Sequence, residues 1–267
     1  MKVALLLSGL QRNFEPFIQN QMENIIKKYN CDVFIYTSSE NSYRHWDVEL
    51  DDIFYKQVKG QKDTFKNNMK FFKDKYDKYL KNIYIDENNE SFEKFKINVV
   101  KPLDIDKTFH INLISAYFKV HSCIELMENY EKENNVKYDI VFRMRLDGFT
   151  DQHFSRINIL NLNYNNNCYM SITDKQWRDD CCVVMSRNNI DILKNFVFHL
   201  ISIKSKQSII CVEQEILIFL RKNNMNITFI HKFVHRIGGY EDIYKNVPYL
   251  KNEDFKKLYS TEYKLIW

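Results

Sequence analysis

The sequence predicts an α/β protein in which a mostly parallel sheet is flanked by helices. Residues 2–8 and 31–37 are almost wholly apolar, which is typical of strands covered on both faces. Between them, residues 14–29 carry apolar side chains at helical spacing. The same alternation of helix and strand recurs at residues 109–147. Strands that alternate with helices in this way predict a parallel sheet covered by its own crossover helices.

Length and composition predict a single globular domain over residues 1–267, since 45% of the residues are hydrophobic and no linker or internal repeat interrupts them. There is no apolar stretch near the roughly 20 residues of a membrane helix and no secretory signal pattern. Six scattered cysteines without a C-x-x-C pair indicate neither a disulfide framework nor a zinc knot. We therefore expect a cytoplasmic protein, and a net charge of +4 gives no support for a nucleic-acid partner.

The remaining elements follow from apolar spacing. Residues 46–80 and 91–100 show helical patterns on either side of a short strand at 83–85, and residues 109–134 form a long helix that leads into a strand at 138–147. Further along, we expect strands at 168–172, 181–186 and 227–234, and helices at 189–203 and 209–223.

The strand at 138–147 carries the most informative polar pattern. Alternation places Arg143, Arg145 and Asp147 on one face, opposite an apolar face. The carboxyl end of a parallel strand opens on the ligand crevice, and there Asp147 is followed by Gly148. Guanidinium groups bind phosphate oxygens and a carboxylate holds a divalent cation, which predicts a nucleotide diphosphate site. A structural Arg–Asp pair with a turn glycine is the alternative.

The end of the first strand supports the same prediction. Ser8, Gly9 and Arg12 offer a hydroxyl, backbone donors and a guanidinium where the next helix begins. Neither G-x-x-x-x-G-K-[ST] nor G-x-G-x-x-G is present, which argues against P-loop NTPases and dinucleotide oxidoreductases. A plain connection between strand and helix is the alternative.

Together these segments resemble the GT-A glycosyltransferases. The resemblance rests on Ser-Gly-x-x-Arg at residues 8–12, Cys-Asp-Val-Phe-Ile at 31–35 and Tyr-Asp-Ile-Val-x-Arg-x-Arg-x-Asp at 138–147. It is closest to sugar transferases in which R-x-D stands where relatives carry D-x-D. The resemblance implies a GT-A fold and a nucleotide-sugar donor, with the diphosphate held by Ser8, Gly9, Arg12, Arg143 and Arg145.

Within this resemblance Asp147 corresponds to the last acid of the D-x-D motif, and Arg145 takes the place of the first. Two alternatives follow: Asp147 holds Mn²⁺ or Mg²⁺, completed by His235, or Asp147 contacts the donor directly while Arg145 supplies the positive charge. A lone surface histidine is the alternative interpretation of His235.

The resemblance also implies a base that deprotonates the acceptor hydroxyl. Asp180, just before the strand at 181–186, is the preferred candidate, and Glu213, near the start of the helix at 209–223, is the second. Ordinary turn acids and a carboxylate that favours the helix dipole are the respective alternatives.

Residues 56–81 hold nine lysines and three aspartates, so their net charge of +6 exceeds that of the whole chain. The spacing predicts an amphipathic helix with a basic stripe and a separate aromatic face. A solvated face is favoured in a Lys-rich chain, and peripheral contact with an anionic membrane is the alternative.

We therefore expect a glycosyltransferase that moves a sugar from a nucleotide-sugar to a hydroxyl of a glycan or glycolipid. One alternative is a nucleotidyltransferase, which would need two metal-binding acids where Arg145 and Asp147 stand. The other is a non-catalytic scaffold that binds a glycan or a membrane.

Overall fold

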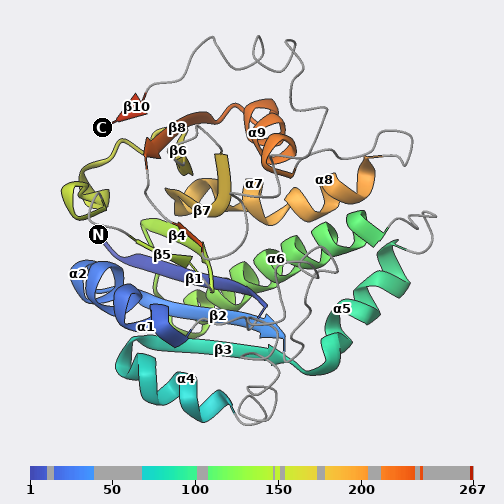
Figure 1. The fold of residues 1–267 in the computed structure, drawn as a ribbon, viewed down its shortest axis with the longest axis horizontal. Coiled ribbons are helices and arrows are strands. Elements are labelled where there is room, and N and C mark those ends of the chain that lie inside the picture. Colours follow the sequence, from blue (N-terminus) through green and yellow to red (C-terminus); the bar gives the residue numbers. More distant parts are fainter. Residues whose placement is uncertain are drawn as a thin grey trace, which may run out of the picture.

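The computed structural model describes residues 1–10, 15–38, 68–100, 108–146, 148–150, 154–172, 178–203, 212–231, 235–236 and 265–266. The main sheet has eight strands in the order β10-β8-β6-β7-β4-β1-β2-β3, which Figure 1 shows from top to bottom. Only β7 runs antiparallel to its neighbours; every other pair in this sheet is parallel. The predicted α/β class with a mostly parallel sheet is confirmed.

The strands of the main sheet are β1 (Val3–Leu10), β2 (Asp32–Ser38), β3 (Leu80–Asp86), β4 (Ile140–Arg145), β6 (Asn167–Ile172), β7 (Arg178–Ser186), β8 (Asn226–His231) and β10 (Leu265–Ile266). A separate two-stranded ladder pairs β5 (Gly148–Phe149) with β9 (His235–Arg236). The α-helices are α1 (Glu15–Gln21), α2 (Lys27–Tyr29), α4 (Asn68–Tyr76), α5 (Glu90–Phe95), α6 (Thr108–Asn134), α7 (Ile190–Lys194), α8 (Phe196–Ser202) and α9 (Val212–Lys222).

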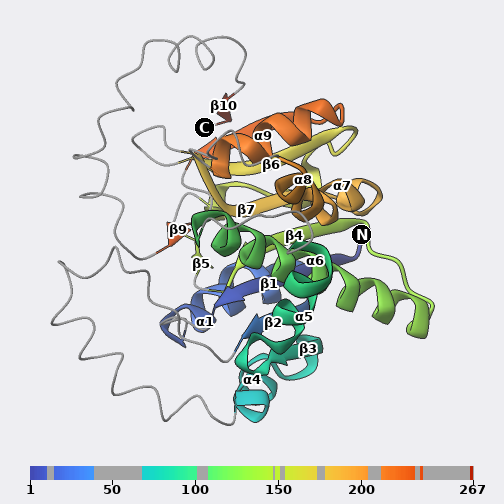
Figure 2. The ribbon, with the colours of Figure 1, turned by 90° about the vertical axis from the view of Figure 1, so that its right-hand side faces the viewer.

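Two apolar cores lie on the two faces of the sheet, because alternate residues of each strand point in opposite directions. In β1, Ala4 and Leu6 join the core beneath α6, α8 and α9, whereas Val3, Leu5 and Leu7 join the core beneath α1, α2 and α4. Figure 2 shows α5, α6, α8 and α9 following one another along the sheet. Helices therefore cover both faces, as the apolar strands predict.

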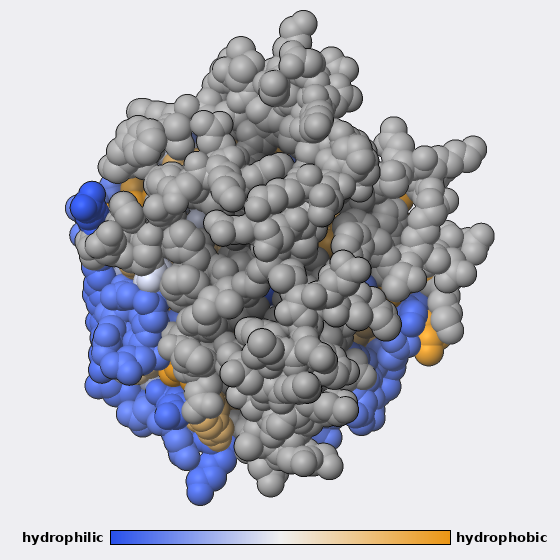
Figure 3. Space-filling model, viewed as in Figure 1, coloured by the Kyte–Doolittle hydropathy of each residue, from blue (hydrophilic) through white to orange (hydrophobic). Residues whose placement is uncertain are grey.

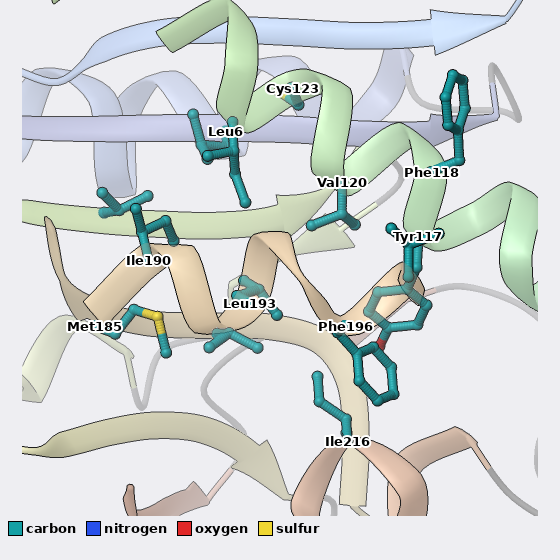
Figure 4. Packing of buried hydrophobic residues seen from close by; sticks show 14 of the residues in the cluster. Leu6, Tyr117, Phe118, Val120, Cys123, Met185, Ile190, Leu193, Phe196 and Ile216 are labelled. Carbon is teal, nitrogen blue, oxygen red and sulfur yellow. The ribbon is translucent and has the colours of Figure 1, made fainter. Parts of the chain in front are cut away.

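Aromatic packing joins α6 to α8 over the first of these cores. Tyr117 meets Phe196 edge to face, with ring centroids 4.5 Å apart, and both side chains are buried (Figure 4). Val120 follows Tyr117 along α6, and Leu6 of β1 lies further along the same core (Figure 4). This packing fixes α6 above the strands whose carboxyl ends carry the predicted site.

Several element boundaries differ from the sequence prediction. The basic helix ends at Tyr76, and Leu80 and Lys81 belong to β3, because their backbone pairs with β2; residues 56–67 of that predicted helix lie outside the described residues. The strand predicted from residue 181 begins at Arg178. The helix predicted at 189–203 is divided at Asn195 into α7 and α8. None of the helices in the described ranges combines the length and apolar character needed to cross a bilayer.

Candidate functional site

The strand order creates a switch point between β1 and β4. From β1 the chain moves to β2 and then β3 on one side, whereas β4 lies on the other side. In open α/β sheets the crevice outside the carboxyl ends of such strands is the usual ligand site. The register pairs Ser8 of β1 with Arg145 of β4, so two predicted site residues from distant segments lie side by side.

Ser8 and Ser38 place two buried hydroxyl groups at this edge. Both residues are fully buried, and neither Oγ atom finds a hydrogen-bond partner within the part of the chain that the structure describes. Leaving a buried polar group unsatisfied costs about 1–3 kcal/mol, so water or a ligand at this edge would stabilise both. Sequence reasoning missed Ser38, because a serine that ends an apolar strand has no distinguishing local signal.

The two arginines of β4 share the face that α6 covers, but they differ in exposure. Arg143 is 4% exposed, and its guanidinium carbon lies 5.8 Å from the ring centroid of Tyr117 in α6. Arg145, two residues closer to the edge, is partly exposed. Arg145 is thus the more accessible of the two at this edge, and Arg143 lies beneath it.

The apolar face of β4 is as predicted. Ile140, Phe142, Met144 and Leu146 all join the core beneath α1 and α2, whereas Val141 joins the core beneath α6. This alternation confirms the assignment of Arg143 and Arg145 to a common face.

Cys123 lies in the core below these residues. Its thiol contacts the carbonyl oxygens of Leu7 and Phe34 at 3.8 and 3.5 Å. Burial raises the pKa of Cys123 to about 12, although the charge of Arg143 acts in the opposite direction. The group therefore remains a thiol at neutral pH and is not a nucleophile.

A tight turn follows β4. The Leu146 N–H donates to the Ser8 carbonyl at 3.3 Å, which extends the contact between β1 and β4 to the edge. A Cβ atom on Gly148 would lie 2.8 Å from Met144 Cγ and 3.0 Å from the Arg145 carbonyl oxygen. Only glycine leaves enough space for this turn. Two predicted site residues lie outside the described residues: Asp147, between Leu146 and Gly148 in the sequence, and Arg12, which follows β1.

The antiparallel strand β7 brings a pair of acids to the same edge. Met144 pairs with Cys182, so the first residues of β7, Arg178 to Asp180, lie where β4 ends. The structure describes the backbone of Asp180 and places it within a strand, not in the preceding loop as expected. Asp180 thus comes from the strand next to β4, although it is remote from β4 in sequence.

Glu213 lies at the start of α9, which approaches the same edge of the sheet above strands other than β4. α9 leads into β8 through a short turn, so its first residues lie near the end of β8. With strands about 4.8 Å apart, β8 is about 14 Å from β4, because β7 and β6 lie between them. α9 also contacts β7, but Glu213 belongs to a helix that covers the sheet, whereas Asp180 belongs to the strand next to β4.

The small ladder of β5 and β9 places His235 near the turn. Phe149 pairs with His235 and Gly148 with Arg236, so the backbone of His235 lies opposite a residue two positions after Asp147. Among the described residues no three His, Cys, Asp or Glu side chains gather as metal ligands would. The predicted partnership of His235 with Asp147 stays a prediction, because Asp147 lies outside the described residues.

No protein-family model matches the chain, and no curated protein sequence matches it either. Among solved structures, it is similar to 4-diphosphocytidyl-2C-methyl-D-erythritol synthase from Anaerococcus prevotii, with a TM-score of 0.40 and 10% identity over 94% of this chain and 99% of that one. It is also similar to a mutant form of a transferase, with a TM-score of 0.37 and 9% identity over 90% of this chain and 87% of that one. Likeness at these values says nothing about activity.

Proposed function

We propose that this protein transfers a sugar from a nucleotide-sugar donor to a hydroxyl of a glycan or glycolipid. The observation that carries the proposal is the register pairing of Ser8 with Arg145 at the switch point of the sheet. A hydroxyl and a cation therefore lie together at the edge where α/β sheets bind nucleotides. The neighbour of β4 is β7, whose first residues include two acids.

In this proposal the arginines serve the diphosphate. Arg145 and Arg12 contact its oxygens, while Arg143 adds positive charge from below, and Ser8 and Gly9 offer hydrogen bonds at the end of β1. Catalysis comes from positioning the donor and from stabilising the negative charge that develops on the departing diphosphate.

The acceptor side is assigned to Asp180, with Glu213 as the second candidate. The carboxylate takes the proton of the acceptor hydroxyl while the oxygen of that hydroxyl bonds to the anomeric carbon of the donor sugar. The bond from that carbon to the diphosphate oxygen breaks at the same time, and the nucleoside diphosphate leaves with the electron pair. Asp180 is preferred because β7 neighbours β4.

Asp147 and His235 are the residues that would hold a divalent metal; the β5–β9 pairing, in which His235 lies opposite Phe149, supports this choice. When bound, Mn²⁺ or Mg²⁺ supplies positive charge to the diphosphate. In the alternative, Asp147 binds hydroxyl groups of the donor and Arg145 neutralises the diphosphate. Activity that is equal with Mn²⁺ and with a chelator would select this second role.

The first experiment is a thermal-shift screen with UDP, GDP, CDP and ADP, each with and without MnCl₂. A ligand that binds only the folded chain raises its stability, so we expect at least one of these probes to raise the Tm. The same probe is then used in calorimetry on wild type, on Arg145→Ala and on Arg156→Ala, an exposed arginine in a turn after β5.

We expect Arg145→Ala to weaken diphosphate binding by about 1.5–3 kcal/mol, the contribution of a charge-assisted hydrogen bond, or about 10- to 150-fold. Arg156→Ala should bind as wild type does. Unchanged affinity in a folded Arg145→Ala protein would remove the central claim. Release of pyrophosphate from a nucleoside triphosphate would favour the nucleotidyltransferase, and binding without release of nucleoside diphosphate from any nucleotide-sugar would favour the scaffold.

A further inference from the structure

Gln21, the last residue of α1, makes contacts that the proposed chemistry does not use. It is fully buried, and its Nε2 atom donates to the carbonyl oxygens of Leu146 at 3.0 Å and of Gly148 at 2.8 Å. These two carbonyls belong to the residues on either side of Asp147. One amide group from another part of the chain therefore holds the backbone on both sides of that position.

Tyr76 of α4 fixes the orientation of this amide. Its hydroxyl donates to Gln21 Oε1 at 2.7 Å, and the residue is fully buried. Burial raises the pKa of Tyr76 above its ordinary value, so the hydroxyl stays protonated and remains a donor. With its oxygen occupied by Tyr76, the Gln21 amide directs both N–H groups at the two carbonyls, which uses its full donor capacity.

Asn20, the preceding residue of α1, holds the same loop further along. Its Oδ1 accepts from the Thr150 N–H at 2.8 Å and from the Thr150 hydroxyl at 3.1 Å, and its Nδ2 donates to the Thr150 carbonyl at 2.8 Å. The last two residues of α1 thus form hydrogen bonds with every second residue from 146 to 150.

We infer that Gln21, oriented by Tyr76, is a positioning residue for the turn that follows β4. It sets where the backbone of Leu146 and Gly148 lies relative to the end of β1, before any ligand binds. The inference rests on the proposed function, because it assumes that a diphosphate binds at this turn. Binding sites are most precise when a second set of hydrogen bonds holds the residues that touch the ligand. A loose turn would have to become ordered on binding, and this ordering would reduce the free energy of binding.

The test compares Gln21→Leu with Gln19→Leu. Gln19 lies in the same helix, but it is exposed and donates only to Glu23 among the bonds described. The first readout is hydrogen exchange of the peptide covering residues 144–151 in the ligand-free proteins. The second is calorimetric affinity for whichever of UDP, GDP, CDP or ADP raises the wild-type Tm most.

We expect Gln21→Leu to exchange faster in this peptide and to bind the diphosphate about tenfold or more weakly, while Gln19→Leu matches wild type in both. If Gln21→Leu does not fold, Tyr76→Phe replaces it in the test, because this variant keeps the ring and removes only the hydroxyl. We expect faster exchange and weaker diphosphate binding here too, each by a smaller amount.

Gln21→Glu adds a readout that a purely structural role would not move. A carboxylate at this position cannot donate to either carbonyl, whereas the neutral acid can donate to one of them. Burial raises the pKa of a carboxyl group, so diphosphate binding by Gln21→Glu should recover as the pH falls from 8 to 6, relative to wild type at each pH. Gln21→Leu should show no such recovery.

The outcomes separate the two claims. Wild type that binds none of the four diphosphates overturns the proposed function and the positioning role with it. Wild type that binds, together with a folded Gln21→Leu protein of unchanged exchange or unchanged affinity, overturns the positioning role alone. Absence of the pH-dependent recovery in a folded Gln21→Glu protein also contradicts it.

Discussion

At the scale of single residues, the turn after β4 requires glycine for space. Gly148 is buried, and a Cβ atom there would meet both the Met144 side chain and the Arg145 carbonyl. Gly9 at the end of β1 is required for a different reason, since its φ of 135° belongs to a region that other residues rarely adopt. The two glycines nearest the switch point therefore have distinct physical roles.

Gly148→Ala should lower the free energy of unfolding by about 1–3 kcal/mol, the usual cost of overpacking a buried site. Met144 is itself fully buried and cannot swing away freely. Urea unfolding monitored by circular dichroism measures the change. In a Met144→Ala background the additional cost of Gly148→Ala should be smaller, because the closest atom is gone; strict additivity of the two substitutions would contradict the steric explanation.

At the scale of elements, a largely buried charge network ties the second half of α6 to Arg187, just before α7, and to Lys194, the last residue of α7. Arg187 makes ion pairs with Glu131 at 2.8 Å and with Glu128 at 3.3 Å, and Lys194 bonds to Glu128 at 2.7 Å. Burial alone would lower the pKa of Arg187, but the hydrogen bond to Glu131 and the charges of Glu131 and Glu128 raise it above its ordinary value. These side chains are 10–20% exposed, so the network is largely shielded from solvent.

Arg187→Met should destabilise the protein by about 3–5 kcal/mol, because it leaves neighbouring carboxylates without their buried partner. The matched control is Lys96→Met, which removes an exposed pair with Glu93 three residues away and should cost about 0–1 kcal/mol. Both values come from denaturant unfolding at pH 7. Equal effects of the two substitutions would show that burial does not strengthen the network.

At the scale of the whole molecule, positive charge is concentrated in one segment of the sequence. Residues 56–81 carry a net charge of +6, so the rest of the chain sums to −2. α4, which holds part of this segment, packs beside β3, and the face in Figure 3 is mainly hydrophilic at the lower left, where Figure 1 places α2 and α4. Lys70 and Lys73 are exposed, whereas Phe72 and Tyr76 are fully buried, which confirms the separate aromatic face within α4.

We expect the joint change of Lys62, Lys66, Lys70 and Lys73 to Gln to leave the Tm unchanged within about 2 °C, since surface changes cost little. Any sedimentation of wild type with vesicles of anionic lipid should decrease in this variant and at high salt, because exposed charges act over about 10 Å at 0.1 M. Transfer to a soluble acceptor should not change. Loss of that transfer in the variant would place the basic segment in the active site. If neither protein sediments with the vesicles, the basic segment is only a solvated face.

Local patterns were sufficient to predict most elements. The apolar runs of β1 and β2, the helical spacing of α6 and the alternation in β4 are decided by which side chains avoid water, and this depends on near neighbours in the sequence. The structure confirms the α6 helix and the two faces of β4. The boundaries of α4 and β7 were missed because the hydrogen bonds that decide them come from distant strands.

The sequence by itself determined the strands, the helices and the chemical character of the residues at the strand ends. Only the tertiary structure decided that β7 runs antiparallel beside β4, which brings Asp180 to the edge, and that His235 lies opposite Phe149. It also decided that Gln21 holds carbonyls 125 and 127 residues away. Burial preferences are written into local periodicity, whereas these contacts depend on strand order and on hydrogen bonds between distant segments, which no local pattern specifies.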